Sequence, residues 1–340
     1  MPRPDVRPLA ALGPAILTAT LLGACAALPG GAQAADPPPR LGDCTVFPAD
    51  NVWNSRVDHL SVLPESAAYV AAIGRTATLH PDFGSGTWDG APIGIPWVAV
   101  GAGQPRVAVT FYYPTESDPG PYPIPADAPI EGAPIEGAPI GGVAAGGDRH
   151  VLVVDTADCV LYELYDAELT ASGAWAAGSG AVFDLTSNDL RPDGWTSADA
   201  AGLPILPGLV RYDEVAAGAI HHAIRFTAPR TRRAHVWPAR HDASSSTDPD
   251  YPPMGQRFRL RADFDATGMA PEAQVIVTAM QRYGVILADN GSSWFISGAP
   301  DERWDNAALR DLKAITGADF EAVDGTSLMV ERDSARVRGR

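Results

Sequence analysis

The stretch His150-Val-Leu-Val-Val154-Asp-Thr-Ala-Asp158-Cys159-Val-Leu-Tyr-Glu-Leu-Tyr165 decides the fold class. Its two apolar runs, 150–154 and 160–165, flank a short connection over residues 155–158. This spacing predicts a β-hairpin, because short polar connections join antiparallel strands. Cys159 is expected to open the second strand. The centre of the chain is therefore predicted to be antiparallel sheet.

Further strand patterns lie on both sides of the hairpin, and turn-forming residues separate almost all of them. They predict strands at 97–100, 106–113, 209–212, 223–227, 234–237 and 258–262. Short, unevenly spaced strands are typical of mainly β proteins, and we expect an antiparallel β-sandwich or jelly-roll-like body.

The end of the chain has a different pattern. Pro271 suits the first turn of a helix over 271–282, and Gly284 separates that helix from a short strand at 285–288. A second helix is expected at 305–315. These elements predict a small C-terminal α/β element on the β body.

Composition limits the class of protein. Of the 340 residues, 46% are hydrophobic and 19% are charged, and 34 are glycine and 32 proline. These values exclude a coiled coil, a collagen and a highly charged disordered chain. We expect a single β-rich domain over 44–330, between a proline-rich linker at 35–43 and a charged tail at 331–340.

One internal repeat is present. Ala128-Pro-Ile-Glu-Gly132 recurs at 133–137 and again, with glycine in place of glutamate, at 138–142. Five-residue copies cannot bury a core, so 128–147 is interpreted as a low-complexity surface loop. A flexible flap over a site is the alternative.

Residues 1–34 are typical of a secretion signal. Arg3 and Arg7 precede a nearly continuous apolar run, and small residues precede Ala35. We therefore predict a secreted, extracellular protein. The alternative is a lipid anchor at Cys25, because Leu22-Gly23-Ala24-Cys25 fits a lipoprotein cleavage box.

Cysteine counting supports export. Cys25 leaves with the signal or carries lipid, which leaves Cys44 and Cys159 as one pair. In an oxidising compartment these two are predicted to form a disulfide, and two buried free thiols are the alternative.

Charge limits the partners. The net charge of −16 becomes −17 when the signal, with two arginines and one aspartate, is removed. Nucleic acid is not expected as a partner, because phosphate binding depends on Lys and Arg. A neutral extracellular glycan is the easier ligand. We expect a monomer with no transmembrane segment in the mature chain and no cofactor.

The chain has no serine-hydrolase elbow, zincin motif or Walker loop, and its candidate chemistry lies in carboxylates near strand ends and aromatic residues. Paired acids perform glycoside hydrolysis, one as general acid and one as base or nucleophile. The candidate catalytic acids are Asp82, Asp89, Asp148, Glu163 and Asp289. Solvated turns and hairpin pairs are the simpler interpretation of each acid.

Polar and aromatic neighbours of these acids are candidate substrate contacts: His80, Trp88, His150, His222, Arg257, Asn290 and Trp294. Aromatic rings pack on sugar faces and amides bond hydroxyl groups. No metal site is predicted, although His222, His235 and His241 lie close enough in sequence to be considered together.

Four segments carry a resemblance to known sequences: Asp50-Asn-Val-Trp-Asn54, the stretch from His80 to Trp88, the stretch from Gly202 to Glu214, and Ala288-Asp-Asn-Gly-Ser-Ser-Trp294. Together they resemble a family of uncharacterised secreted bacterial proteins over residues 44–328. The resemblance implies no activity, cofactor or catalytic residue.

These observations favour a secreted carbohydrate-active enzyme, a glycoside hydrolase acting on a neutral polysaccharide. One alternative is a non-enzymatic glycan-binding or cell-surface protein. The other is a His-ligated metal-dependent enzyme, or a polysaccharide lyase in which His or Tyr acts as base beside Arg.

Overall fold

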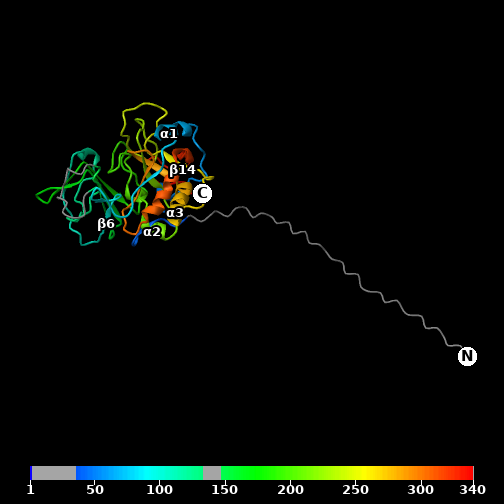
Figure 1. The fold of residues 1–340 in the computed structure, drawn as a ribbon. Coiled ribbons are helices and arrows are strands. Elements are labelled where there is room, and N and C mark those ends of the chain that lie inside the picture. Colours follow the sequence, from blue (N-terminus) through cyan, green and yellow to red (C-terminus); the bar gives the residue numbers. More distant parts are fainter. Residues whose placement is uncertain (2–35, 133–146, 340) are drawn as a thin grey trace. The chain divides into compact units, whose positions relative to one another are not determined.

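The computed structural model describes residues 1, 36–132 and 147–339. The predicted secretion signal, including Cys25, and most of the predicted low-complexity loop lie outside these residues. The described residues from 36 onward belong to one compact unit. In Figure 1 its cyan and green strands lie to one side, and helices α1 and α3 lie to the other.

The mainly β class is confirmed, and the largest sheet is mixed. Its six strands, in spatial order, are β17 (Phe320–Ala322), β14 (Arg257–Leu260), β15 (Val285–Asn290), β13 (Ile224–Ala228), β16 (Phe295–Ser297) and β3 (His80–Asp82). Strand β13 runs parallel to β15 and antiparallel to β16, and β16 runs parallel to β3. Strand β15 is buried on both faces over its first four residues, as expected of a central strand.

The predicted hairpin forms within a second, four-stranded sheet. Its spatial order is β12 (Ser179–Asp184), β9 (Val160–Tyr165), β8 (Val151–Asp155) and β6 (Trp97–Val100). Strands β8 and β9 pair antiparallel, with Asp155 opposite Val160, whereas β6 pairs with β8 in parallel. Cys159 does not open the second strand but lies in the turn, with φ 55°.

Two apolar cores cover the two faces of the four-stranded sheet. Leu152 and Val154 belong to the largest cluster of buried apolar residues, which we call the main core and which also contains apolar residues of the six-stranded sheet. Val151 and Val153 face a smaller core. That smaller core is completed by a three-stranded sheet of β10 (Glu168–Leu169), β11 (Trp175–Ala177) and β7 (Val109–Phe111). Strand β8 is consequently buried along its whole length.

Helix α3 (Pro271–Arg282) forms where predicted, with Pro271 in its first turn. Its buried stripe, with helical spacing, packs into the main core through Ala273, Ile276, Val277, Ala279 and Met280. The following strand β15 lies inside the six-stranded sheet, so the C-terminal α/β element is part of the main body. The second predicted helix is α4 (Asn306–Arg310), capped by Asp305 and continued by a 3₁₀ turn.

Two predicted strands are absent as regular elements. Segments 209–212 and 234–237 make only isolated bridges, at Val210 and His235. The first runs into helix α2 (Tyr212–Ala216), and the second is followed by Pro238, which cannot donate to a ladder. The strand expected at 106–113 is limited to β7.

The flanking segments are built into the fold. The expected linker contains β1 (Arg40–Leu41), which pairs with β2 (Cys44–Thr45), and the Leu41 side chain is buried. In the expected tail Ala335 and Val337 are buried, and Val52 N donates to Ala335 O at 2.8 Å. Helix α1 (Ser66–Ile73) and the β4–β5 hairpin (Thr87–Trp88 and Ala91–Pro92) precede β6 in the chain.

The predicted Cys44–Cys159 disulfide is confirmed and connects residues 115 apart in sequence. It fixes the N-terminal β1–β2 hairpin to the turn between β8 and β9. Closing so long a loop restricts the unfolded chain.

We expect the Cys44→Ser/Cys159→Ser double variant to lose about 4–5 kcal/mol of unfolding free energy, because the unfolded chain regains loop entropy. Urea unfolding followed by tryptophan fluorescence measures the loss, and reduction of the wild type should reproduce it. Equal stability of the two proteins would contradict a structural role for the bond.

Candidate functional site

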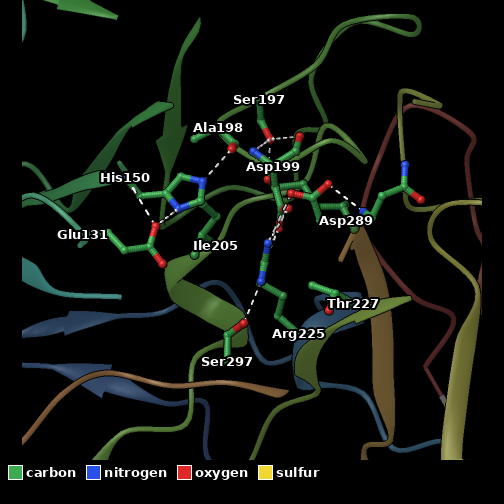
Figure 2. A network of polar contacts seen from close by, with 12 residues as sticks. Glu131, His150, Ser197, Ala198, Asp199, Ile205, Arg225, Thr227, Asp289 and Ser297 are labelled. Atoms are coloured by element: carbon green, nitrogen blue, oxygen red, sulfur yellow. Dashed lines mark hydrogen bonds and ion pairs between the residues drawn. The ribbon is translucent and has the colours of Figure 1, made fainter. Parts of the chain in front are cut away.

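Two predicted site residues that are distant in sequence, His150 and Asp289, belong to one set of polar contacts between the two large sheets (Figure 2). Figure 2 shows the contacts, which we call the polar network: Glu131, His150, Asp199, Arg225, Asp289 and Ser297. Arg225 lies on β13 and Ser297 on β16 of the six-stranded sheet. His150 directly precedes β8 of the four-stranded sheet.

Arg225 forms the centre of the polar network. Its Nε and Nη2 donate to the two carboxylate oxygens of Asp199 at 2.6 and 2.8 Å, and its Nη1 donates to Ser297 Oγ at 2.6 Å. Arg225 and Asp199 are both buried. A two-point contact of this kind orients both groups and neutralises the buried charge.

Asp289 is a second carboxylate at the same guanidinium. Its Oδ2 lies 3.5 Å from Arg225 Nη2, its Oδ1 accepts from Asn290 N at 2.6 Å, and its side chain is 19% exposed. Burial raises the pKa of Asp289 to about 8, and the negative charge of Asp199 adds to the effect against the attraction of Arg225. A partly exposed carboxylic acid that stays protonated at neutral pH can donate a proton.

His150 and Glu131 form a second buried pair beside the first. His150 Nδ1 lies 2.5 Å from Glu131 Oε2, and Nε2 donates to the carbonyl of Ala198 at 3.0 Å. Burial lowers the pKa of His150, but the Glu131 carboxylate outweighs that effect and raises it to about 9. The ring is therefore an imidazolium, and Ala198 links it to the neighbouring Asp199.

Asp82 and Asp148 lie at the exposed side of the polar network. Asp82 pairs with Ser297 in the β3–β16 register, and its side chain is 60% exposed. Its neighbour His80 stacks on Phe295, with ring centroids 4.1 Å apart. Asp148 is exposed, and its charge raises the pKa of Asp289. Three candidate acids thus share one region.

Glu163 has a structural role instead of the predicted catalytic one. It is fully buried, and it accepts hydrogen bonds from Ile205 N and Leu206 N at 2.9–3.0 Å. Burial raises its pKa to about 7 against these backbone bonds. Its carboxyl group fixes the start of a 3₁₀ turn and has no access to substrate.

Three predicted substrate contacts are buried, and none of them belongs to the polar network (Figure 2). Trp294 stacks on Phe226 and Phe320, and His222 contacts Glu214 at 3.2 Å and bonds the Ala223 carbonyl. Arg257 donates to the carbonyls of Val52 and Ser55. None of the three can pack on a sugar beside the polar network. At the polar network they are therefore not available to a substrate.

Trp88, Asp89 and Asn290 have other positions. Trp88, 79% exposed, and Asp89 lie in the β4–β5 hairpin, and no contact of the described residues joins them to the polar network. Asn290 follows Asp289, but its amide bonds Thr231 and the Ala243 carbonyl.

The three histidines considered for metal binding have separate partners. His235 contacts Asp193 and Asp242, whereas His241 donates to the Ala200 carbonyl and His222 contacts Glu214. Across residues 36–132 and 147–339, no group of three or more His, Cys, Asp or Glu side chains is arranged to hold a metal ion.

Sequence reasoning missed four members of the polar network. Glu131 belongs to the first copy of the repeat that was interpreted as a surface loop. Asp199 and Ser297 lie in polar segments without a motif. Arg225 carried a signal, because it lies between the apolar residues Ile224 and Phe226, where a buried guanidinium requires an acidic partner.

No protein-family model, curated protein or solved structure matches the chain. In the part of the chain that the structure describes, no helix has the length and apolar character needed to cross a membrane.

The Glu131–His150 pair predicts a pH-dependent stability. The folded pKa of His150, about 9, exceeds its ordinary value of 6.5, so the stabilisation is complete below pH 6.5 and is lost as the pH rises through 9. We expect Glu131→Gln to be less stable than the wild type by roughly 2–3 kcal/mol at pH 6, with a smaller difference at pH 9.5.

Urea unfolding of both proteins between pH 6 and 9.5 measures this difference. Comparing the two proteins at each pH removes the titration of groups that do not interact with His150, and the remaining difference includes the response of Asp289 and Glu163 to the charge on His150. A difference that stays constant over this range would show that His150 is not held as a cation.

Proposed function

We propose that the protein is a secreted carbohydrate-active hydrolase that cleaves glycosidic bonds of a neutral extracellular polysaccharide. The observation that carries the proposal is the position of Asp289: its partly exposed carboxyl lies 3.5 Å from the guanidinium of Arg225, which Asp199 already neutralises, and the charge of Asp148 acts on it. The Cys44–Cys159 disulfide supports an extracellular location.

Asp289 is the general acid in this proposal. Glycosidic cleavage requires a proton on the leaving oxygen, and a carboxyl group with a pKa near 8 carries that proton at neutral pH. Once the proton is transferred, the new carboxylate lies 3.5 Å from Arg225 Nη2, which stabilises its charge. The same group can then accept a proton from water.

Asp148 is our candidate for the second carboxylate, which attacks the anomeric carbon or activates water. It is exposed at the end of the segment that leads into β8, and its charge acts directly on Asp289. Asp82 is the alternative, because its side chain is 60% exposed and it pairs with Ser297 of the polar network in the β3–β16 register.

Tyr165 supplies an aromatic surface in the same region. Its ring centroid lies 6.1 Å from that of His150, and the charges of Asp148 and Asp289 both act on its hydroxyl. A half-buried tyrosine ring suits a sugar, which offers an apolar face and hydroxyl groups.

We expect Asp289→Asn to lower polysaccharide cleavage by about 10²–10⁴-fold with its unfolding midpoint unchanged or raised, since a buried acid is replaced by a neutral amide. Release of reducing ends from a panel of neutral polysaccharides measures the activity. Wild-type activity should fall as the pH rises above about 8. Asp263→Asn, at an exposed carboxylate, is the matched control.

Failure of the mature wild type to release oligosaccharide from any polysaccharide of the panel would contradict hydrolysis. Saturable binding that survives Asp289→Asn would then favour the alternative of a glycan-binding protein.

The second carboxylate is tested with two separate variants. We expect Asp148→Asn to lose about 10²-fold or more in rate and to regain part of it with added azide, a small anion that replaces the missing nucleophile. Asp82→Asn should lose less. A larger loss, with azide rescue, in Asp82→Asn would assign the role to Asp82 instead.

A further inference from the structure

A pocket of about 480 Å³ lies apart from the polar network and shares no lining residue with it. Its walls are mostly apolar and include Val52, Leu63, Val236, Trp237, Leu328 and Met329. Tyr69, Arg232, Gln256 and Arg257 add polar groups. The size and the mixture of surfaces are typical of small-molecule sites.

Arg257 brings a buried charge to this pocket. The residue is 6% exposed, and its Nη2 donates only to the carbonyls of Val52 and Ser55, at 3.2 and 3.1 Å. Its Nε has no hydrogen-bond partner, and no carboxylate among the described residues pairs with it. Burial alone lowers its pKa to about 9. A buried cation without an acidic partner is rare.

Arg232 is a second arginine of the same pocket with a buried nitrogen that lacks a hydrogen-bond partner. Its Nε is buried without a hydrogen-bond partner, and its guanidinium carbon lies 5.9 Å from the centroid of the Tyr69 ring. Only four buried side-chain atoms of the described residues lack a partner, and two of them belong to these pocket arginines. By contrast, the pocket residues Arg240 and Arg332 are paired with Asp333 and Asp193.

The acidic residues of the pocket limit the charge of a ligand. Asp193 is occupied by Arg332 and His235, and Asp324 accepts two hydrogen bonds from Thr326. Glu65 is exposed. These carboxylates do not neutralise Arg232 or Arg257, but they oppose a ligand with two negative charges. A single negative charge on an apolar body fits the pocket better.

We propose that this pocket binds a small organic monocarboxylate. Its carboxylate lies within reach of the Arg232 and Arg257 guanidinium groups, which are the planar donors best suited to that anion. Its apolar body packs against Tyr69, Trp237 and the aliphatic wall. The proposal does not depend on the hydrolase function, because the two sites share no residue.

The test uses titration calorimetry on the mature full-length protein, with benzoate and hexanoate as probes and benzamide and hexanamide as their neutral counterparts. We expect at least one carboxylate to bind with a Kd about tenfold or more below that of its amide, because charge-assisted hydrogen bonds are lost with the amide. Inorganic phosphate should bind more weakly than that carboxylate.

Arg232→Gln should raise the Kd of the carboxylate about tenfold or more, and because Arg232 side-chain hydrogen bonds within the pocket are incomplete, the variant should remain folded. Arg257→Gln should do the same if it folds, which its circular dichroism spectrum shows. Arg261→Gln, on an exposed arginine that extends the same strand pattern, is the matched control, and Asp289→Asn should bind normally.

Equal affinity for carboxylates and amides, an unchanged Kd in Arg232→Gln, or phosphate binding as tight as that of the carboxylates would each overturn the proposal. Loss of binding in Asp289→Asn would also overturn it, since it would place the ligand at the polar network.

Discussion

The buried Arg225–Asp199 ion pair is the contact on which the arrangement of the two large sheets depends. Strand β13 carries Arg225, whereas Asp199 lies in the loop after β12 of the other sheet. Burying a charge without its partner costs several kcal/mol, so burial of Arg225 and burial of Asp199 each favour the presence of the other. The pair therefore fixes the register between the loop and the six-stranded sheet, and with it the position of Ala198.

The same pair sets the chemistry of the acids around it. Because Asp199 already neutralises Arg225, Asp289 meets the guanidinium as an excess carboxylate and keeps its proton. His150, bonded to the Ala198 carbonyl, is held as a cation by Glu131 and not by Asp289. Beside the Arg225–Asp199 pair, Glu131 and His150 thus form a charged pair, whereas Asp289 is a neutral acid. General acid catalysis requires such a neutral acid.

Local patterns predicted the local elements. The 150–165 hairpin follows from two apolar runs around a short connection, helix α3 from Pro271 and Gly284 at its ends, and the disulfide from the number of cysteines. Five of the predicted site residues lie at or beside the polar network (Figure 2): His80, Asp82, Asp148, His150 and Asp289. Residue type alone does not report burial, and the sequence therefore predicts substrate or catalytic roles for Trp294, His222 and Glu163, which the fold buries. Asp199 and Glu131 were missed because their partners are distant in sequence.

Each proposed site is marked by a local imbalance of charge around a buried arginine, which the net charge of the chain does not reveal. The chain carries a net −16, which by itself argues only against polyanionic partners. Around Arg225 there is one carboxylate too many, and the excess group holds a proton. Around Arg257 there is one carboxylate too few, and the buried cation faces an apolar pocket. An excess or a missing carboxylate beside a buried arginine lowers the stability of the folded protein. Such a charge imbalance is expected where a proton or a ligand supplies the missing partner.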